Sequence, residues 1–268
     1  MTSIRRLALL VPMLALCALA GFKGAHADTL ADIRQRGKII IAIDLNSPPF
    51  GMADDKLNPY GSDVTSAQML AKDLGVALEI VQVTGPNRVP YLLTGKADIV
   101  MASFSITPER AKVVDFSLPY SAADSVVAAF ASTPIGSLAD LAGKRVGVVR
   151  GNLQDTLLIP LVPKGTTMVR FDDDATNAIA LLSGQVDAIG TAKELVVETA
   201  QRNPDKHIET KFSVKVVPQG IGMRKGETAL KAWIDNWVTV NMKNGRLGDS
   251  YQKAAGTPLP DLSSYFPK

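Results

Sequence analysis

The stretch LLTGKADIV at residues 92–100 returns as LLSGQVDAI at residues 181–189, and this repetition decides the fold. In each copy two leucines end a helix-like pattern, a glycine follows where a helix commonly stops, and an apolar run then has the character of a strand. A helix that leads through a glycine into a buried strand is the unit of an α/β protein. The repetition indicates that the unit occurs twice, with chance similarity between ordinary helix-to-strand units as the alternative.

A second pair of segments repeats in the same order. Gly37-Lys38 precedes the run Ile39–Ile43, which ends at Asp44, and Gly143-Lys144 precedes a similar run that ends at Arg150. The continuous β-branched composition of Ile39–Ile43 is typical of a strand buried on both faces of a parallel sheet. Together the two repeats predict an α/β fold of two lobes, each a mainly parallel sheet flanked by helices.

Two extended segments are candidates for the connections between these lobes. Asp124–Phe130 is apolar without a helical pattern, and Lys215–Met223 contains a proline and two glycines. Taking them as crossovers places residues 28–124 and 220–268 in the first lobe and residues 125–219 in the second. The tail from Glu227 to Ala255 is expected to be helical, with an apolar stripe that packs against the core.

The first 27 residues have the pattern of a secretory signal peptide. Arg5 and Arg6 precede an uncharged stretch, and Ala25-His26-Ala27 matches an A-x-A cleavage site, so the mature chain should begin near Asp28. A membrane anchor is the alternative, but the uncharged stretch 7–22 is shorter than the ~20 residues that a spanning helix needs. The single cysteine, Cys17, lies in this segment, and no disulfide is therefore expected in the mature chain, which we expect to be periplasmic.

Charge and composition exclude several classes of function. Three of the 29 basic residues and none of the 26 acidic ones lie in the leader, so 26 of each sign remain, which argues against a nucleic-acid partner. His207 is the only histidine beyond the leader, and it lies in a polar stretch typical of a loop. Without a cysteine, a metal-ligand spacing or a phosphate-binding glycine loop, no catalytic residue, metal or cofactor is expected.

Polar residues follow the strand expected at residues 98–101, where ligands bind in open parallel sheets. Thr107 and Pro108 suit the start of a short helix, and Arg110 offers a planar fork of donors that fits a carboxylate. A solvated arginine at a helix start is the alternative interpretation.

This stretch, with the following VDFSLPY at residues 114–120, closely resembles the family 3 (polar amino acid) solute-binding proteins of ABC transporters. Further matches are PPF at 48–50, RVPYLL at 88–93, GKRVGV at 143–148 and GIGMRK at 220–225. The resemblance implies a type II periplasmic-binding-protein fold, two lobes joined by two hinge strands that close on a small polar ligand. It also implies a monomer that delivers an amino acid or similar carboxylate to a membrane permease, without enzyme activity.

The resemblance also implies a set of ligand-binding residues. Arg110 corresponds to the clamp for the ligand carboxylate, and Arg88 to an arginine that pairs with a second carboxylate in members that bind acidic amino acids. The full set expected to contact the ligand, including Arg150 discussed below, is Asp44, Phe50, Arg88, Ser103, Phe104, Ser105, Arg110, Arg150, Asn152 and Leu153.

One departure from the family pattern affects the ligand class. Ala192 stands where amino-acid-binding members place an aspartate for the ligand ammonium, and a buried ammonium without a counter-charge costs several kcal/mol. Either another acid replaces it, with Asp44 and Glu194 as candidates, or the ligand lacks an α-amino group. Cyclohexadienyl dehydratases resemble this fold too, and such an enzyme is the alternative function.

The two repeats also suggest how the lobes face each other. Asp44 and Arg150 end corresponding strands, so we expect the two side chains to point into the cleft from opposite sides. There they would bracket a zwitterionic ligand or form a latch that favours closure. A surface Arg-Gly turn at Arg150 is the alternative.

Overall fold

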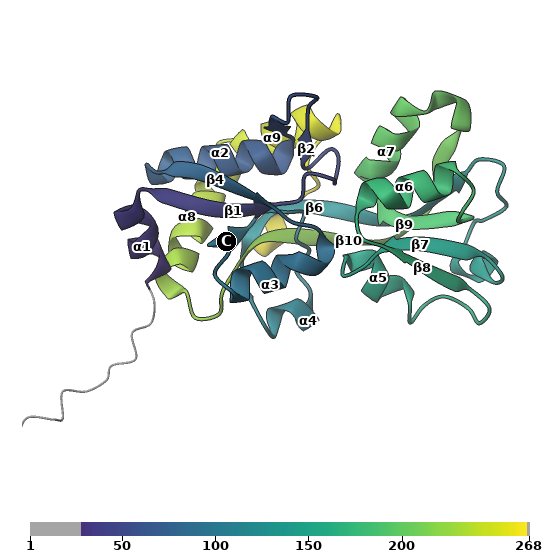
Figure 1. Ribbon diagram of the computed structural model, residues 1–268, viewed down its shortest axis with the longest axis horizontal. Coiled ribbons are helices and arrows are strands. Elements are labelled where there is room, and N and C mark those ends of the chain that lie inside the picture. The colour runs from purple at the N-terminus through teal and green to yellow at the C-terminus, as the bar shows by residue number, and fades with distance from the viewer. Residues whose placement is uncertain (1–27, 267–268) are drawn as a thin grey trace, which may run out of the picture.

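The computed structural model describes residues 28–266, and the predicted signal peptide, residues 1–27, lies outside this range. The chain begins with α1 and alternates strands and helices until the long C-terminal helices (Figure 1). The helices are α1 (Thr29–Arg36), α2 (Ser62–Leu74), α3 (Arg88–Leu93), α4 (Pro108–Ala111), α5 (Leu153–Leu158), α6 (Asp174–Leu182), α7 (Lys193–Arg202), α8 (Thr228–Lys243) and α9 (Arg246–Ala255). The strands are β1 (Lys38–Ile43), β2 (Met52–Ala53), β3 (Pro59–Tyr60), β4 (Ala77–Gln82), β5 (Ile99–Val100), β6 (Asp115–Phe130), β7 (Arg145–Val149), β8 (Thr167–Phe171), β9 (Ala188–Ala192) and β10 (Ile208–Met223).

Eight strands form one hydrogen-bonded order, β4-β1-β5-β10-β6-β9-β7-β8. At one end β1 lies between β4 and β5 and pairs with both in parallel, and at the other end β7 lies in the same way between β8 and β9. Each parallel group carries its own helices, so Figure 1 shows two lobes. The expected two-lobe α/β architecture is confirmed. We call the group around β1 the first lobe and the group around β7 the second lobe.

The central strands β6 and β10 run through both lobes and are the longest strands of the described residues. They pair antiparallel from Asp115 with Met223 to Phe130 with Ile208, with four shifts of register along the way. In the first lobe β10 pairs with β5, and in the second lobe β6 pairs with β9. Both expected crossover segments lie within these two strands. The exact lobe boundaries stay a prediction.

The two sequence repeats occupy corresponding places. The first-strand repeat falls on β1 and β7, and the helix-glycine-strand repeat falls on α3 to β5 and on α6 to β9. Gly95 and Gly184 have φ angles of 70° and 74°, a left-handed conformation that disfavours other residues. The same local requirement at both sites explains why the glycine recurs.

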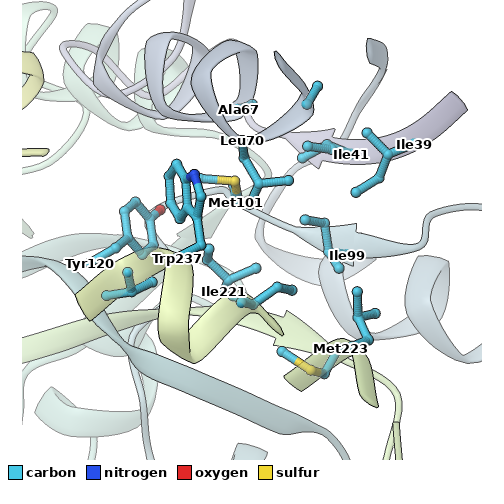
Figure 2. Packing of buried hydrophobic residues seen from close by; sticks show 14 of the residues in the cluster. Ile39, Ile41, Ala67, Leu70, Ile99, Met101, Tyr120, Ile221, Met223 and Trp237 are labelled. Atoms are coloured by element: carbon cyan, nitrogen blue, oxygen red, sulfur yellow. The ribbon is translucent and has the colours of Figure 1, made fainter. Parts of the chain in front are cut away.

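The core of the first lobe packs on both faces of β1. Ile39 and Ile41 belong to the cluster on one face, which also contains Ala67 and Leu70 of α2 and Trp237 of α8 (Figure 2). Ala42 points to the opposite face, against Leu92 of α3. This burial confirms the prediction of a doubly covered strand. Burying such apolar side chains contributes roughly 1.5–3 kcal/mol each relative to exposure.

The C-terminal tail is helical, as expected, but it consists of two helices and not of one continuous helix. Gly245, with φ 83°, interrupts it, so α8 ends at Lys243 and α9 begins at Arg246. Leu230, Ile234 and Trp237 form the expected buried stripe on α8. Within residues 28–266, no helix combines the length and the apolar character needed to cross a bilayer.

Candidate functional site

A small cavity lies where the two lobes meet. It has a volume of about 30 Å³, and a single water needs roughly 10–15 Å³, so it holds only a few waters. The lobes must therefore separate before a larger molecule can enter. The lining residues come from both lobes and from the central strands: Ser47, Phe50, Arg88, Ser103, Ser105, Ala123, Asn152, Leu153, Gln154, Asp174, Ala192, Leu195 and Gln219.

Arg88 joins the two lobes at this cavity. It is the first residue of α3 and is buried, and its Nη2 lies 3.2 Å from Oδ2 of the equally buried Asp44, just beyond β1. Its Nη1 donates a hydrogen bond of 2.8 Å to Oδ1 of Asn152, at the start of α5 in the second lobe. Burial raises the pKa of Asp44, and the neighbouring Arg88 opposes this rise. The charge of Arg88 is thus matched within the first lobe.

Asp174 is a cavity residue that the sequence interpretation missed. It is the first residue of α6, and its Oδ2 accepts a 2.8 Å hydrogen bond from Oγ of Ser47 in the first lobe. Burial, reinforced by the charge of Asp44, raises the pKa of Asp174 to about 7. The preceding Asp173 caps the helix, because its side chain accepts a hydrogen bond from the backbone N–H of Thr176. Asp174 is therefore not needed as the cap.

Arg110 spans the rim between the lobes. Its Nη1 donates to the carbonyl oxygen of Ser105 at 2.8 Å, and its Nη2 donates to that of Gly151, in the second lobe, at 2.7 Å. The guanidinium lies 4.9 Å from the ring centre of Phe104, which is buried beneath it. Burial lowers the pKa of Arg110 to about 9, which still leaves it charged at neutral pH. No acid of the described residues forms a salt bridge with it.

Asp63 stabilises the conformation of the loop that follows β5. Ser103 has φ 48°, a left-handed conformation uncommon for a residue other than glycine. Its backbone N–H donates to Oδ2 of Asp63 at 2.8 Å, and the hydroxyl of Tyr120 donates to Oδ1 at 2.7 Å. Burial raises the pKa of Asp63 to about 6. This support keeps Ser103 and Ser105 facing the cavity.

An apolar wall closes the opposite side of the cavity. Phe50, Ala192 and Leu195 form a buried cluster with Tyr251 of α9. The hydroxyl of Tyr251 donates a 2.6 Å hydrogen bond to Oε1 of Glu194 in the second lobe, and burial raises the pKa of Glu194. The Oε2 atom of Glu194 is buried without a partner among the described residues. Glu194 does not line the cavity.

Four hydrogen bonds around the cavity cross from one lobe to the other, and in each the donor belongs to the first lobe. The donor and acceptor residues are Arg88 and Asn152, Arg110 and Gly151, Ser47 and Asp174, and Tyr251 and Glu194. The second lobe thus presents acceptors to the interface, two of them carboxyl groups.

The lobes also touch through a glycine. A Cβ atom on Gly85 would lie 2.6 Å from the carbonyl oxygen of Arg150 and 2.7 Å from Oδ1 of Asn152. Real Cβ atoms do not approach other atoms so closely, so this approach of the lobes requires a residue without a side chain at position 85.

The expected opposition of Asp44 and Arg150 is wrong. Asp44 pairs with Arg88, whereas the side chain of Arg150 is 55% exposed and its Nε lies 3.5 Å from Oδ1 of Asp172, also exposed, in its own lobe. Arg150 lies beyond the end of β7, at the turn that contains Gly151, with φ 73°, and its side chain extends to solvent there.

The other predicted site residues gather at the cavity. Phe50, Arg88, Ser103, Ser105, Asn152 and Leu153 line it. Asp44, Phe104 and Arg110 lie behind lining residues and contact them or their neighbours. Their roles in binding stay predictions, because no bound molecule tests them.

Comparisons with known proteins agree with this geometry. The family model of the bacterial extracellular solute-binding proteins, family 3, matches residues 39–257. The ABC transporter glutamine-binding protein GlnH of Bacillus subtilis is 30% identical over 254 residues, which cover 91% of this chain and 92% of that protein.

Solved structures have the same fold. A mutant of ArgBP from T. maritima superposes with a TM-score of 0.79 at 29% identity, covering 85% of this chain and 100% of that one. The ancestral amino acid-binding protein AncCDT-1, a precursor of cyclohexadienyl dehydratase, does so with a TM-score of 0.78 at 32% identity, covering 84% and 98%. The expected type II fold is confirmed. The chain belongs to family 3 of the bacterial extracellular solute-binding proteins.

Proposed function

We propose that this protein is the periplasmic substrate-binding component of an ABC importer, and that it captures an amino acid or a close derivative between its lobes. The relatives support the ligand class, since their names state glutamine, cystine and arginine as ligands. The ligand carboxylate binds to Arg110, with Ser103 and Ser105 beside it.

The observation that carries this proposal concerns the charge and the hydrogen-bond acceptors of Arg110. Its guanidinium is charged, lies behind the cavity lining beside Ser105 and, among the described residues, donates only to two carbonyl oxygens. A carboxylate satisfies a guanidinium better than neutral carbonyls do, because a charge-assisted pair of parallel hydrogen bonds is roughly twice as strong. When the lobes open, Arg110 loses the carbonyl oxygen of Gly151 as an acceptor, and its guanidinium becomes available to a ligand.

The charges around the cavity support a zwitterionic ligand over an acidic one. Arg88 is already matched by Asp44, so it offers little to a second carboxylate. The remaining charged groups are Arg110 and Asp174, one of each sign. A ligand with one carboxylate and one cationic group leaves this set balanced, whereas a second carboxylate adds an uncompensated buried charge.

Closure is the mechanism of capture. We place the lobe boundaries at residues 28–124 with 220–268 and at 125–219, so that β6 and β10 absorb the rotation. A ligand that binds the closed form more tightly than the open form shifts the population toward closure. The closed lobes, as a monomer, then present a joint surface to the membrane permease, after the predicted leader has directed export and been removed near Ala27.

A ligand screen tests the proposal directly. L-amino acids, cystine, diamines and dicarboxylates are added to the purified mature protein while the unfolding temperature is followed. A ligand that binds only the folded state raises stability by RT ln(1 + [L]/Kd), about 2.7 kcal/mol at a hundredfold excess over Kd. Small-angle scattering with the best ligand should show closure. Failure of every amino acid to bind would reject the proposed ligand class.

A dehydratase is the second candidate, because AncCDT-1 is described as a precursor of that enzyme. A dehydratase needs an acid or base in contact with its substrate. Glu194 is the carboxyl group nearest the apolar wall, but it is hydrogen-bonded to Tyr251 and does not line the cavity. Asp174 does line the cavity, so the lining alone does not separate the two candidates, and we favour binding without catalysis because the relatives are named as binding proteins. Turnover of prephenate or arogenate by the purified protein would reverse that preference.

A further inference from the structure

We propose that Asp174 supplies the counter-charge for a cationic nitrogen of the ligand, in place of the acid missing at position 192. The inference rests on the proposed function, because it concerns the same cavity. It assigns the recognition of an ammonium, amine or guanidinium group to the start of α6 in the second lobe.

The other acids near the cavity are already engaged. Asp44 pairs with Arg88, and Asp63 accepts hydrogen bonds from Ser103 and Tyr120. Glu194 accepts from Tyr251 and lies outside the lining. None of these three carboxyl groups is placed to meet a ligand cation.

Asp174 differs from these three acids in its position at the cavity and in its hydrogen bonds. It lines the cavity and is 8% exposed, and its only hydrogen bond among the described residues is the one from the Ser47 hydroxyl to Oδ2. Its Oδ1 accepts none. The charged groups that act on it are Asp44, Asp173 and Arg88, and the two acids discourage its ionisation. A cation in the cavity would relieve that unfavourable state.

The direction of the hydrogen bonds across the interface supports the same assignment. Around the cavity the first lobe contributes the donors, including Arg110, and the second lobe contributes the acceptors. Away from the cavity lining the direction is reversed once, where Arg202 of the second lobe donates to the sulfur of Met52. A zwitterion fits between these walls in one orientation, with its carboxylate toward the first lobe and its cationic nitrogen toward the second. Asp174 is the acid of the second lobe that reaches the cavity.

The test combines a variant with a pair of ligands. The amino acid that raises the unfolding temperature most is compared with its desamino analogue by calorimetry, on the wild type and on Asp174→Asn. Asparagine keeps an acceptor for Ser47, so the fold should persist. Asp173→Asn is the matched control, because it removes the neighbouring charge while asparagine still caps the helix.

We expect Asp174→Asn to weaken the amino acid about 30-fold or more, as when a buried charge loses its partner, and Asp173→Asn to change affinity little. Removal of the α-amino group should weaken binding to the wild type similarly. The effect of the variant should vanish for the desamino analogue if the α-ammonium is the group bound. If it persists only for ligands with a cationic side chain, the side-chain cation is the group bound.

Equal affinity of the wild type and Asp174→Asn for the amino acid would overturn the assignment while leaving the proposed function intact. A dicarboxylate without any cationic nitrogen as the tightest ligand would overturn the assignment together with the proposed amino acid ligand. Binding of no compound in the screen would reject the proposed function and this inference together. If the variant does not fold, equal affinity of the wild type for the amino acid and for an analogue without any cationic nitrogen would still overturn the assignment.

Discussion

The two lobes repeat one order of strands, but their cavity walls satisfy their charges differently. In the first lobe, Asp44 is paired with Arg88 of the same lobe, and Asp63 is held by Ser103 and Tyr120, also of the same lobe. In the second lobe, Asp174 and Glu194 accept their hydrogen bonds from Ser47 and Tyr251, which belong to the first lobe.

The acids of the first-lobe cavity wall therefore have their partners within their own lobe. The acids of the second-lobe wall gain their partners only when the lobes close. Opening leaves the ion pair of the first lobe intact but removes the hydroxyl partners of both acids in the second lobe. In the open form water solvates these acids, so on closure the hydroxyl groups of the first lobe, or groups of a ligand, must replace that water as hydrogen-bond partners. Variants on each wall should therefore produce different kinds of effect.

The largest effect should come from the first-lobe donor that a ligand uses. Arg110→Ala should weaken the best amino acid ligand by about 3–5 kcal/mol, because its carboxylate would be buried without its charged partner. Calorimetry measures the loss, and circular dichroism checks the fold. Lys112→Ala, which removes an exposed cation two residues away, is the matched control. Near-native affinity of Arg110→Ala would exclude Arg110 from the carboxylate site.

Breaking the ion pair of the first lobe should affect stability in the absence of any ligand. Arg88→Met leaves the buried Asp44 without its partner and should lower the free energy of unfolding by about 3 kcal/mol. Adding Asp44→Asn should recover part of this loss, since the stranded charge is then gone. Urea denaturation of the single and double variants measures both steps.

The control for this pair lies on the surface of the second lobe. Arg145 and Asp187 form an exposed salt bridge of 2.7 Å, and exposed pairs contribute at most about 1 kcal/mol. Arg145→Met should therefore have the smaller effect. An equal loss for Arg88→Met and Arg145→Met would show that the first-lobe wall does not depend on its buried pair.

The repeated order of helices and strands could be predicted from the sequence, because local sequence patterns determine it. The glycines at 95 and 184, the apolar run Ile39–Ile43 and the two extended segments each report on their immediate surroundings. Most residues of the site followed from the resemblance of motifs such as the one that contains Arg110. Those signals persist in any arrangement of the lobes.

The pairing of charges across the interface could not be predicted, because it depends on which way each strand end turns. Arg150 follows β7 as Asp44 follows β1, but its side chain extends to solvent at the turn that contains Gly151. Asp174 lies in the run Asp172-Asp173-Asp174, which from sequence is typical of a solvated helix start. Only the placement of α6 against the first lobe buries one of those three acids.

A side chain added between the lobes should change their closure without altering any charged group. Gly85→Ala places a Cβ atom against Arg150 and Asn152 and should disfavour the closed form by about 1–3 kcal/mol, the range for overpacking. Scattering should then show a larger radius of gyration with ligand present, and affinity should fall. Gly136→Ala is the control, because its Cβ would meet nothing closer than 3.8 Å. Unchanged closure would mean that the contact at Gly85 is not maintained in solution.

The smallest effect should come from a second-lobe acid that loses one hydroxyl partner. Tyr251→Phe removes the one hydrogen bond that the described residues of the other lobe donate to the Glu194 carboxyl group, and it should disfavour closure by about 1 kcal/mol, the usual net contribution of one hydrogen bond. Tyr91→Phe, a change of the same chemistry within the first lobe, is the control. Because Glu194 gains this hydrogen bond only when the lobes close, the loss of the bond should appear in ligand affinity and in scattering. If Tyr251→Phe instead lowers the stability of the open, ligand-free protein, the bond already exists before closure, and the contrast between the two walls is wrong at this position.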